Sequence, residues 1–460
     1  MELLKGWDCL KILAELVKEE KLEAYLVGGA LRDIFLGKNN VDLDIVLRKR
    51  VAEIARYFAE KIKGSFVTLD DKHKIYRVIG KDIFFDFTAM KGDSILEDLS
   101  RRDFTINAMA FPICSGDNFS GFLDLQKVID PLGGLRDLKD KKIRVTNERV
   151  FIDDPLRLWR AFRFATEGFV IEEKTRELIS ENSMLAGQVA RERIKEELMK
   201  ILQKKDSAKI IREMEEEGLF SSIIPEIKQM KETGENKYHH EDAWNHSLQV
   251  LNALEEILED GRYNKYVAIE QHPLLKFTAL LHDIGKINSR IVRGGQVHYY
   301  GHENAGVKIL KPILKGLRFS GKEVSFVCGV VRFHMRPFYL YTAEKLSKKG
   351  ILRFFRQGDA LVPAILIHSL ADKLANMRSN KRSAEIPLYI AFIDELFTKY
   401  EDFLERTELL YLNGRDIIAI TGLPEGPRIG ELLNELIIAQ ANGEVNNRNE
   451  AIAYIKSISD

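Results

Sequence analysis

The stretch that most constrains this chain contains two short β-like runs that flank a glycine pair. The run 25–27 stops at Gly28 and Gly29, where a backbone without Cβ atoms can approach a phosphate at the entrance to a helix. Arg32 adds a fixed positive charge to this turn. The run 41–47 alternates between acidic and apolar residues, which predicts a strand with two carboxylates on one face. The chain therefore begins with strands and helices that present paired acidic groups.

The two carboxylates, Asp42 and Asp44, are two residues apart, and on a strand this spacing places their Cα atoms about 6.5 Å apart. Such a pair can converge on two Mg²⁺ ions about 4 Å apart, one activating an attacking hydroxyl and the other neutralising charge on a triphosphate. Alone, an Asp-x-Asp pattern is more commonly a solvated strand end. Further strand signals lie at 75–78 and 83–87. Asp86 is the candidate third catalytic carboxylate, and an edge-strand residue facing water is its alternative.

The composition narrows the class of protein. At 460 residues the chain is long enough for about three domains, and 30% charged residues with only 11 prolines favour a helix-rich soluble protein. Lysine plus arginine equals aspartate plus glutamate at 70 each, so any RNA site must be a local patch. Three scattered cysteines are typical of reduced core thiols in a cytosolic protein, which predicts a cytoplasmic location. No apolar run reaches membrane length, so no membrane partner is expected.

A motif at residues 101–109 combines arginine, carboxylate and amide groups. Arg102, Asp103 and Asn107 could clamp a ribose and a triphosphate, because arginine supplies planar donors and the other two bind sugar hydroxyls. Alone, the motif would rather indicate a surface Arg–Asp cluster leading into a buried strand.

Residues 155–164 predict a helix that begins at a proline, with Asp154 as its N-cap. Arg157, Arg160 and Arg163 recur every three residues along it, and such a stripe is usually a solvated helix face. Asp154 and Arg157 also form an acceptor–donor pair that can meet the Watson–Crick edge of a base.

Five motifs in this order resemble the class II tRNA nucleotidyltransferase and bacterial poly(A) polymerase family. They are residues 28–33, 42–44, 101–107, 153–157 and 192–198. The resemblance implies Mg²⁺ binding by Asp42 and Asp44, and base selection by Asp154 and Arg157 without a nucleic-acid template. The residues expected to bind the nucleotide are Gly28, Gly29, Arg32, Arg102, Asp103, Asn107, Asp154, Arg157, Arg160 and Arg163.

Two departures from the family pattern bear on the reaction. The family usually has Glu-Asp before the proline of the fourth motif, whereas this chain has Asp153 and Asp154, which could alter how Arg157 is oriented. Family members that complete the terminal A carry a longer loop after the third carboxylate, often with arginine and aromatic residues. Here only residues 87–100, without arginine, separate Asp86 from the third motif. Because the connection is short, the sequence is compatible with addition of CC alone as well as with addition of the full CCA.

Histidine marks a later helical segment, where nine of the ten histidines fall between His239 and His368. This segment resembles the HD superfamily of metal-dependent phosphohydrolases, and the residues that follow its order are His246, His282, Asp283 and Asp372. Imidazoles and carboxylates from separate helices can hold a divalent transition metal and activate a water for attack on a phosphoester. His302 and His334 could serve a second ion or the substrate phosphate. The implied substrates are 2′,3′-cyclic or terminal phosphates on RNA ends.

The predicted fold is a multidomain α+β protein whose nucleotidyltransferase head, with a mixed sheet, is followed by helical parts. The expected domains are the head at 1–140, a helical neck for base selection and RNA contact at 141–235, an HD domain at 236–400 and a tRNA-contacting tail at 401–460. The predicted function is addition of C, with or without the final A, to tRNA 3′ ends from CTP and ATP. The alternatives are a poly(A) polymerase and an HD phosphohydrolase whose head binds nucleotide.

Overall fold

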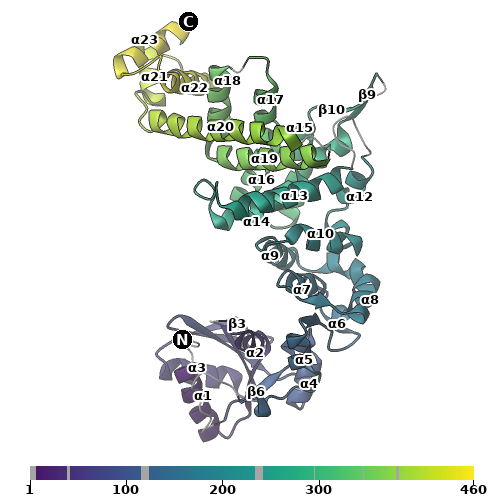
Figure 1. Cartoon of the computed structure of the whole chain (residues 1–460). Helices are drawn as coiled ribbons and strands as arrows, with labels where there is room; N and C mark the ends of the chain where they lie inside the picture. The colour runs from purple at the N-terminus through teal and green to yellow at the C-terminus, as the bar shows by residue number, and fades with distance from the viewer. Residues whose placement is uncertain are drawn as a thin grey trace. The chain divides into compact units, whose positions relative to one another are not determined.

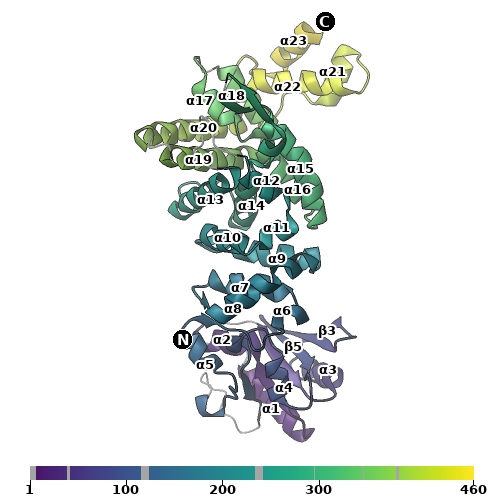
Figure 2. The ribbon, with the colours of Figure 1, turned by 90° about the vertical axis from the view of Figure 1, so that its right-hand side faces the viewer.

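The computed structural model describes residues 7–38, 42–114, 124–233, 242–294, 296–345, 347–379 and 383–459 (Figures 1 and 2). The chain forms two compact units, Met1–Val189 and Ala190–Asp460. The first unit holds a large mixed sheet, and the described part of the second is helical apart from one hairpin, which confirms the predicted α+β class. The domain boundaries at 140, 235 and 400 stay predictions. Residue 41 of the predicted strand and His239 lie outside the described residues.

A six-stranded sheet forms the centre of the first unit, in the order β3-β4-β5-β2-β1-β6. Only β2 and β5 run parallel, and the other neighbours are antiparallel. The strands are β1 (Ala24–Val27), β2 (Asp42–Leu47), β3 (Ser65–Asp70), β4 (Ile75–Gly80), β5 (Ile83–Ala89) and β6 (Ala110–Pro112). The structure confirms strands at the four predicted places. β3 was not predicted because it is a largely exposed edge strand without an apolar face, and β6 because it has three residues.

Apolar residues on one face of each strand build the core beneath this sheet. Phe85 and Phe87 of β5 are fully buried, and Phe58 of α3 packs against them with ring centroids 5.0 and 5.5 Å away. Burial of one such side chain stabilises the fold by about 2–3 kcal/mol. The helices of this unit are α1 (Trp7–Glu19), α2 (Gly28–Phe35), α3 (Val51–Lys61), α4 (Ile95–Ser100), α5 (Gly134–Lys139), α6 (Val150–Asp153), α7 (Leu156–Ala165) and α8 (Glu173–Asn182). Acidic groups are thereby left to the opposite face of β2.

The segment expected to be helical throughout, 140–235, also contains two short strands. β7 (Lys142–Ile143) pairs in parallel with β8 (Val170–Ile171). Strands of two residues are too short for a periodic pattern to reveal them, so the helical prediction was wrong at this point.

The second unit is built from helices that carry the histidine cluster. Its helices before the tail are α9 (Arg191–Leu202), α10 (Ser207–Glu216), α11 (Leu219–Ile223), α12 (Glu226–Lys231), α13 (Ala243–Asp260), α14 (His272–Leu281), α15 (His302–Gly316), α16 (Gly321–Phe333), α17 (Arg336–Thr342), α18 (Lys348–Gly358), α19 (Val362–Ser379) and α20 (Ile386–Thr407). The hairpin of β9 (Arg290–Arg293) and β10 (Gln296–Tyr299) precedes α15. None of the described helices is long and apolar enough to cross a membrane.

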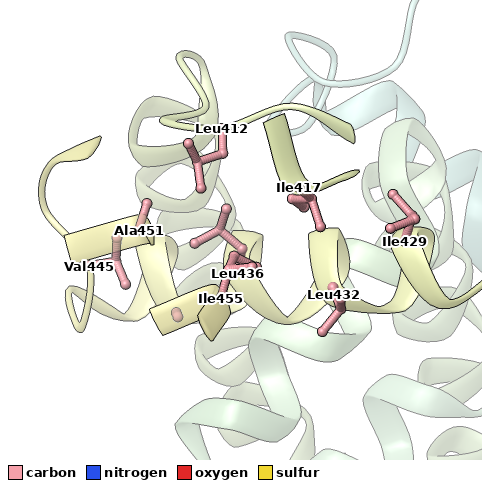
Figure 3. Close-up of a cluster of buried hydrophobic side chains, with 9 residues drawn as sticks. Leu412, Ile417, Ile429, Leu432, Leu436, Val445, Ala451 and Ile455 are labelled. Carbon is pink, nitrogen blue, oxygen red and sulfur yellow. The ribbon is translucent and has the colours of Figure 1, made fainter. Parts of the chain in front are cut away.

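A separate apolar core holds the C-terminal helices α21 (Gly414–Thr421), α22 (Pro427–Asn442) and α23 (Arg448–Ser459) together (Figure 3). Ile417, Leu436 and Ile455 each come from a different one of these helices and are fully buried in this cluster. The cysteines differ in environment: Cys328 is buried, Cys9 is partly buried and Cys114 is exposed. The expectation of three core thiols was therefore wrong for Cys114, which lies two residues after the end of β6 and is exposed.

Candidate functional site

Three acidic residues lie side by side on the central strands of the sheet. The register pairs Asp44 with Val27 of β1 on one side and with Asp86 of β5 on the other. Asp42, the first residue of β2, is exposed, whereas Asp44 and Asp86 are partly buried. Because residues two apart on a strand, and residues directly paired across strands, share one face, all three carboxylates lie on the same face.

The glycine that follows β1 allows a close approach to this acidic group. Gly28 has a φ of +68°, a conformation that side chains with a Cβ rarely adopt. A Cβ at this position would lie 3.0 Å from Arg102 Nη1 and 3.1 Å from Asp44 Oδ2. Glycine is therefore required here both by the backbone and by the space that Arg102 and Asp44 fill. Gly28 also begins α2, so the first amides of that helix lie beside the carboxylates.

The charge on Asp44 is poorly compensated. The pKa of its carboxyl is raised to about 6, because burial, Asp86 and Asp42 together outweigh the opposing effect of Arg102 and Arg32. Carboxylates that disfavour one another's ionisation in this way gain most from a bound cation. Together with their oxygen-only chemistry, this makes Asp42, Asp44 and Asp86 a fitting set for Mg²⁺.

The candidate third carboxylate has a partner that the sequence analysis missed. Arg77 of β4 lies opposite Asp86 in the register and binds it through two hydrogen bonds, Nε to Oδ1 and Nη2 to Oδ2, both 2.7 Å. The metal-binding role of Asp86 stays a prediction. The antiparallel register of β4 and β5, rather than any local motif, brings the two residues together.

A continuous hydrogen-bonded network joins the first and third motifs to α7, the helix that follows the fourth motif. Arg32 of α2 donates from Nη1 to Asn107 Oδ1 at 2.7 Å, and Asn107 Nδ2 donates to Asp103 Oδ1 at 3.0 Å. Arg160 of α7 donates from Nε to the other oxygen of Asp103 at 2.8 Å. Arg32, Asn107 and Asp103 are all buried. Residues more than a hundred positions apart are thus fixed in one arrangement beside the sheet.

Asp103 is the centre of this network. Its burial would raise the pKa of the carboxyl, but Arg160, the Asn107 amide and the Phe104 backbone N–H lower it to about 2. The carboxylate is therefore ionised throughout the physiological range. Whether Asp103 and Asn107 also contact the ribose stays a prediction.

Arg102 is held in place by a carboxylate that the sequence analysis did not name. Asp98 of α4 is buried, and its Oδ2 accepts from Arg102 Nε at 3.0 Å and from Nη2 at 2.9 Å. Asp98 Oδ1 also accepts from the backbone N–H of Lys91. The spacing of four residues between Asp98 and Arg102 is the signal that could have found this pair.

The arginines of α7 do not act as one stripe. Arg157 donates to the backbone carbonyls of Val150 and Arg101, at 3.3 and 2.9 Å, whereas Arg163 donates to Glu167 at 3.2 Å. The N-cap is Pro155 and the helix begins at Leu156, so the predicted N-cap Asp154 was one residue too early, although its Oδ1 accepts from Leu156 N–H at 3.2 Å. The structure thus places Arg157 next to the third motif, Arg160 in the network and Arg163 at the far end of the helix. Base selection by Asp154 and Arg157 stays a prediction.

In the second unit, the histidines and aspartates predicted from the HD pattern come together. His246 lies on α13, the pair His282 and Asp283 follows α14, and Asp372 lies on α19. His246 Nε2 is 2.9 Å from Asp372 Oδ1, and ligand atoms of His246, His282 and Asp372 all lie within 4.8 Å of one another. A second group, His282, Asp283 and His334, meets the same limit. These are candidate metal-binding groups of nitrogen and oxygen donors.

The charges of this cluster favour a bound cation. Burial would raise the pKa values of Asp283 and Asp372, but both lie well below the usual range. Lys286, His282 and His302 lower the pKa of Asp283, and His246 and His282 lower that of Asp372. Burial lowers the pKa of His334 to about 3, so this imidazole is neutral, as a metal ligand must be. Burial would lower the pKa of His282, but Asp283 and Asp372 raise it above the usual value. Ionised carboxylates beside imidazoles fit a divalent transition metal.

His368 is a member of the cluster that the sequence analysis did not select. It lies on α19 one turn before Asp372, is fully buried, and neither ring nitrogen has a hydrogen-bond partner. Its ring centroid is 4.8 Å from that of His282. The spacing of four residues, which places His368 and Asp372 on one helix face, was the available signal.

The tail presents a hollow at the starts of two of its helices. It is lined by residues from α21, α22 and the turn between them, including Asn413, Arg415, Glu425 and Gly426. Asn413 caps α21, accepting from the N–H groups of Arg415 and Asp416. The role of this tail in tRNA contact stays a prediction.

Three family models match the chain in order. The Poly A polymerase head domain matches residues 24–144, the probable RNA and SrmB-binding site of polymerase A matches 168–231, and the HD domain matches 243–377. These matches cover the acidic residues of the sheet and the histidine cluster, whereas residues 154–163 lie between the first two matches.

Relatives match over nearly the whole length. The A-adding tRNA nucleotidyltransferase of Deinococcus radiodurans is 30% identical over 441 residues, which cover 94% of this chain and 95% of the relative. The CC-adding tRNA nucleotidyltransferase of Thermus thermophilus is 30% identical over 447 residues, which cover 94% and 93%. The solved Thermotoga maritima CCA-adding enzyme complexed with tRNA-CCA is similar in fold, with a TM-score of 0.65 at 22% identity over 98% of this chain and 95% of that one.

Proposed function

This chain belongs to the tRNA nucleotidyltransferase family and is a nucleotidyltransferase, and we propose that it adds C residues from CTP to the 3′ end of tRNA and stops at CC. The observation that carries this choice of product is the connection after Asp86. β5 ends at Ala89, Ser94 caps α4, and α4 begins at Ile95, so only a short turn joins the strand to the helix. Asp98 fastens the same helix to Arg102. This connection has no room for the longer loop expected of enzymes that complete the terminal A.

The proposed reaction is attack of the tRNA 3′-hydroxyl on the α-phosphate of CTP, which forms a phosphodiester bond and releases pyrophosphate. Mg²⁺ held by Asp42 and Asp44, with Asp86 as a third candidate, would neutralise charge on the reacting phosphates. Arg102 lies beside Asp44, where its guanidinium can bind the triphosphate while Asp98 orients it. Arg32 is placed by Asn107 on the α2 side of the same acidic group.

Base selection is proposed for Asp154 and Arg157 at the start of α7. The hydrogen bond from Leu156 N–H to Asp154 and the two bonds from Arg157 to backbone carbonyls hold both residues in fixed positions, which is what a protein acting as template requires. Asp153 lies one residue before, at the end of α6, and its exposed carboxylate ion-pairs with Arg149 at 3.8 Å rather than with Arg157.

Sequencing of tRNA ends tests the proposed product. A tRNA lacking its CCA end, incubated with the pure protein, Mg²⁺, CTP and ATP, is expected to end in CC. A CCA end, or a single A added to tRNA that already ends in CC, would contradict the proposal. Long A tracts on unrelated RNAs would instead support a poly(A) polymerase.

We further propose that the histidine cluster hydrolyses phosphoesters on RNA ends, because buried His246, His282 and Asp283 lie together with the partly exposed Asp372 as a set of metal donors. A divalent transition metal held by these residues would supply Lewis-acid chemistry for the hydrolysis. Lys286, whose Nζ lies 2.5 Å from Asp283 Oδ2, adds a positive charge that favours an anionic substrate at this site.

Substitution of one ligand tests this second activity. We expect His282→Ala to lower metal-dependent release of phosphate from RNA carrying a terminal phosphate by about 10³-fold, the loss of about 4 kcal/mol of charge stabilisation. Addition of C should be unchanged, because the transfer residues lie in the other unit. His272→Ala is a matched control, since His272 lies ten residues earlier and its Nε2 is 3.3 Å from the Val267 carbonyl oxygen. Equal hydrolysis by wild type and His282→Ala would contradict the proposal.

A further inference from the structure

We propose that Arg77 binds the last phosphodiester at the 3′ end of the tRNA, the phosphate that precedes the nucleotide carrying the attacking hydroxyl. The inference rests on the proposed transfer of C to tRNA, and it identifies the part of the site that receives the RNA rather than the CTP. It concerns β4 (Ile75–Gly80), a strand that none of the five sequence motifs includes.

The register of the sheet places Arg77 in line with the carboxylates. Arg77 of β4 is paired with Asp86 of β5. Asp86 is paired in turn with Asp44 of β2, and Asp44 with Val27 of β1. Because residues paired directly across strands lie on the same face, the guanidinium of Arg77 is on the face that carries the carboxylates. The opposite face of β4 belongs to the core, where Val78 is fully buried.

The groups expected to hold the CTP lie at the β1 end of this line. Gly28 directly follows β1, and a Cβ built on it would lie 3.0 Å from Arg102 Nη1. Arg32 belongs to α2, which begins at Gly28. The first amides of this helix and the two guanidiniums are donors that a triphosphate can use. The two phosphates that leave as pyrophosphate are therefore expected on the β1 side of Asp44.

The direction of the reaction then places the attacking hydroxyl on the other side of Asp44. The bond from the 3′-oxygen to the α-phosphorus forms as the bond to the pyrophosphate oxygen breaks, and the two oxygens lie on opposite sides of the phosphorus. With pyrophosphate toward β1, the hydroxyl approaches from the side of Asp86 and Arg77. The phosphodiester of the same terminal nucleotide is the nearest negative charge that the RNA brings to this side.

The side chain of Arg77 is held in place and keeps a donor for a phosphate. Asp86 accepts from its Nε and Nη2, both at 2.7 Å, and the guanidinium carbon lies 5.3 Å from the centre of the Phe84 ring. The side chain is 33% exposed. A guanidinium has five N–H groups, and the pair with Asp86 does not use those of Nη1, which can donate to a phosphodiester oxygen. Because Asp86 and Phe84 already order the side chain, RNA binding costs little of its entropy.

The surface around Arg77 suits the sugar of a terminal nucleotide. Ile75 and Ile79 lie two residues to either side of Arg77 on β4 and are partly exposed, as is Phe84 on β5. Val67 of the edge strand β3 is paired with Arg77, and 38% of it is exposed. An arginine among partly exposed apolar side chains can bind a phosphate while its neighbours pack against the ribose and the base.

An uncharged linkage tests the contact without an activity assay. Two tRNAs lacking the CCA end are compared, one with a normal last phosphodiester and one with a methylphosphonate at that linkage, and their equilibrium binding to the full chain is measured without CTP. For the wild type we expect the uncharged linkage to weaken binding about tenfold, which is the loss of one charge-assisted hydrogen bond. Arg77→Ala should bind the normal tRNA about tenfold more weakly and should bind the two tRNAs equally.

Arg56→Ala is the matched control. Arg56 lies on α3, with its guanidinium carbon 4.9 Å from the centre of the Phe66 ring, so it is also an arginine stacked on a phenylalanine of this sheet. Phe66 is paired with Val78, whose side chain is in the core, and Arg56 is therefore on the opposite face. Arg56→Ala should keep the tenfold difference between the two tRNAs. Arg77→Lys, which keeps the positive charge, should keep the greater part of it.

Steady-state kinetics distinguish the RNA from CTP as the ligand of Arg77. Arg77→Ala should raise KM for tRNA about tenfold and leave KM for CTP within about twofold, whatever change in kcat follows when Asp86 loses its partner. A higher KM for CTP alone would assign Arg77 to the triphosphate and overturn the inference. Equal sensitivity of wild type and Arg77→Ala to the uncharged linkage would also overturn it and leave Arg77 as a residue that only orients Asp86.

The outcomes also separate this inference from the proposed function. A wild type that extends no tRNA but still discriminates between the two linkages would overturn the transfer of C and keep the contact with RNA. Circular dichroism and the thermal unfolding midpoint show whether each variant keeps its fold. If Arg77→Ala unfolds, Arg77→Gln takes its place in the comparison, because it removes the charge and keeps a polar side chain that can donate to Asp86.

Discussion

Asp42→Ala is expected to lower nucleotide addition by at least about 10³-fold while binding of tRNA is retained. Asp42 is the exposed first carboxylate of β2 and is not part of the buried core, so its removal takes away a ligand without disturbing the packing of the sheet. Loss of several kcal/mol of charge stabilisation on the reacting phosphates corresponds to an effect of this size. The measurement is single-turnover incorporation of labelled CTP into tRNA lacking its CCA end.

Asp70→Asn is a matched control for this substitution. Asp70 ends β3, at the edge of the same sheet, and bonds to the exposed side chain of His73. Asp70→Asn should leave the rate of CTP incorporation within about twofold of wild type. Retained incorporation in Asp42→Ala would refute the metal role of this residue, and loss of tRNA binding in the same variant would point to a wider defect.

Asp103→Asn is expected to destabilise the first unit and to change how its stability depends on pH. The pKa of Asp103 is about 2 in the folded protein and about 3.9 in an unfolded chain. Because the folded value is the lower one, ionisation of Asp103 stabilises the fold above about pH 4, and this contribution is lost as the pH falls from about 4 to 2. The shift corresponds to about 2–3 kcal/mol for this buried group. The loss in free energy of unfolding caused by Asp103→Asn should therefore be largest at pH 6 and should become smaller below pH 4.

Urea unfolding followed by the fluorescence of Trp159 measures this effect. Trp159 is fully buried on α7, one residue before Arg160, and Trp7→Phe with Trp244→Phe leaves it as the single tryptophan of the chain. Asp103→Ala should cost about 3 kcal/mol or more, because it also leaves Asn107 without its acceptor. A cost of Asp103→Asn that stays constant between pH 6 and pH 3 would show that the charge of Asp103 does not stabilise the network.

The sequence predicted the structure best where the spacing of residues along one strand or helix determines on which side of that element they lie. Alternation along β2 predicted that Asp42 and Asp44 share one side, and the structure confirms a strand there with Leu43 and Ile45 buried on the other. The proline at 155 and Asp154 before it predicted the start of α7, where Asp154 does accept a backbone N–H. The order of His246, His282, Asp283 and Asp372 predicted a cluster that the structure assembles from separate helices.

The spacing of residues did not predict ion pairs between side chains that lie on elements far apart in the sequence. Arg77 reaches Asp86 only through the register of β4 and β5. The spacing of Arg157, Arg160 and Arg163 does not show that Arg160 differs from the other two. Arg160 differs because it binds Asp103, which lies fifty-seven residues earlier. Asp98 could have been paired with Arg102 from spacing alone, but its burial, which gives the pair its importance, could not.

By itself, the sequence determined the family, the order of the motifs and the residue types available for metal and nucleotide chemistry, because these depend on short-range patterns that survive without a structure. Only the tertiary structure decided how those residues are used. It buried Asp103 between Asn107 and Arg160, and it set Nε2 of His302 and Nε2 of His334 3.2 Å apart. The physical reason is that burial and hydrogen-bond direction, which set protonation state and metal affinity, arise from contacts between segments that are remote in sequence.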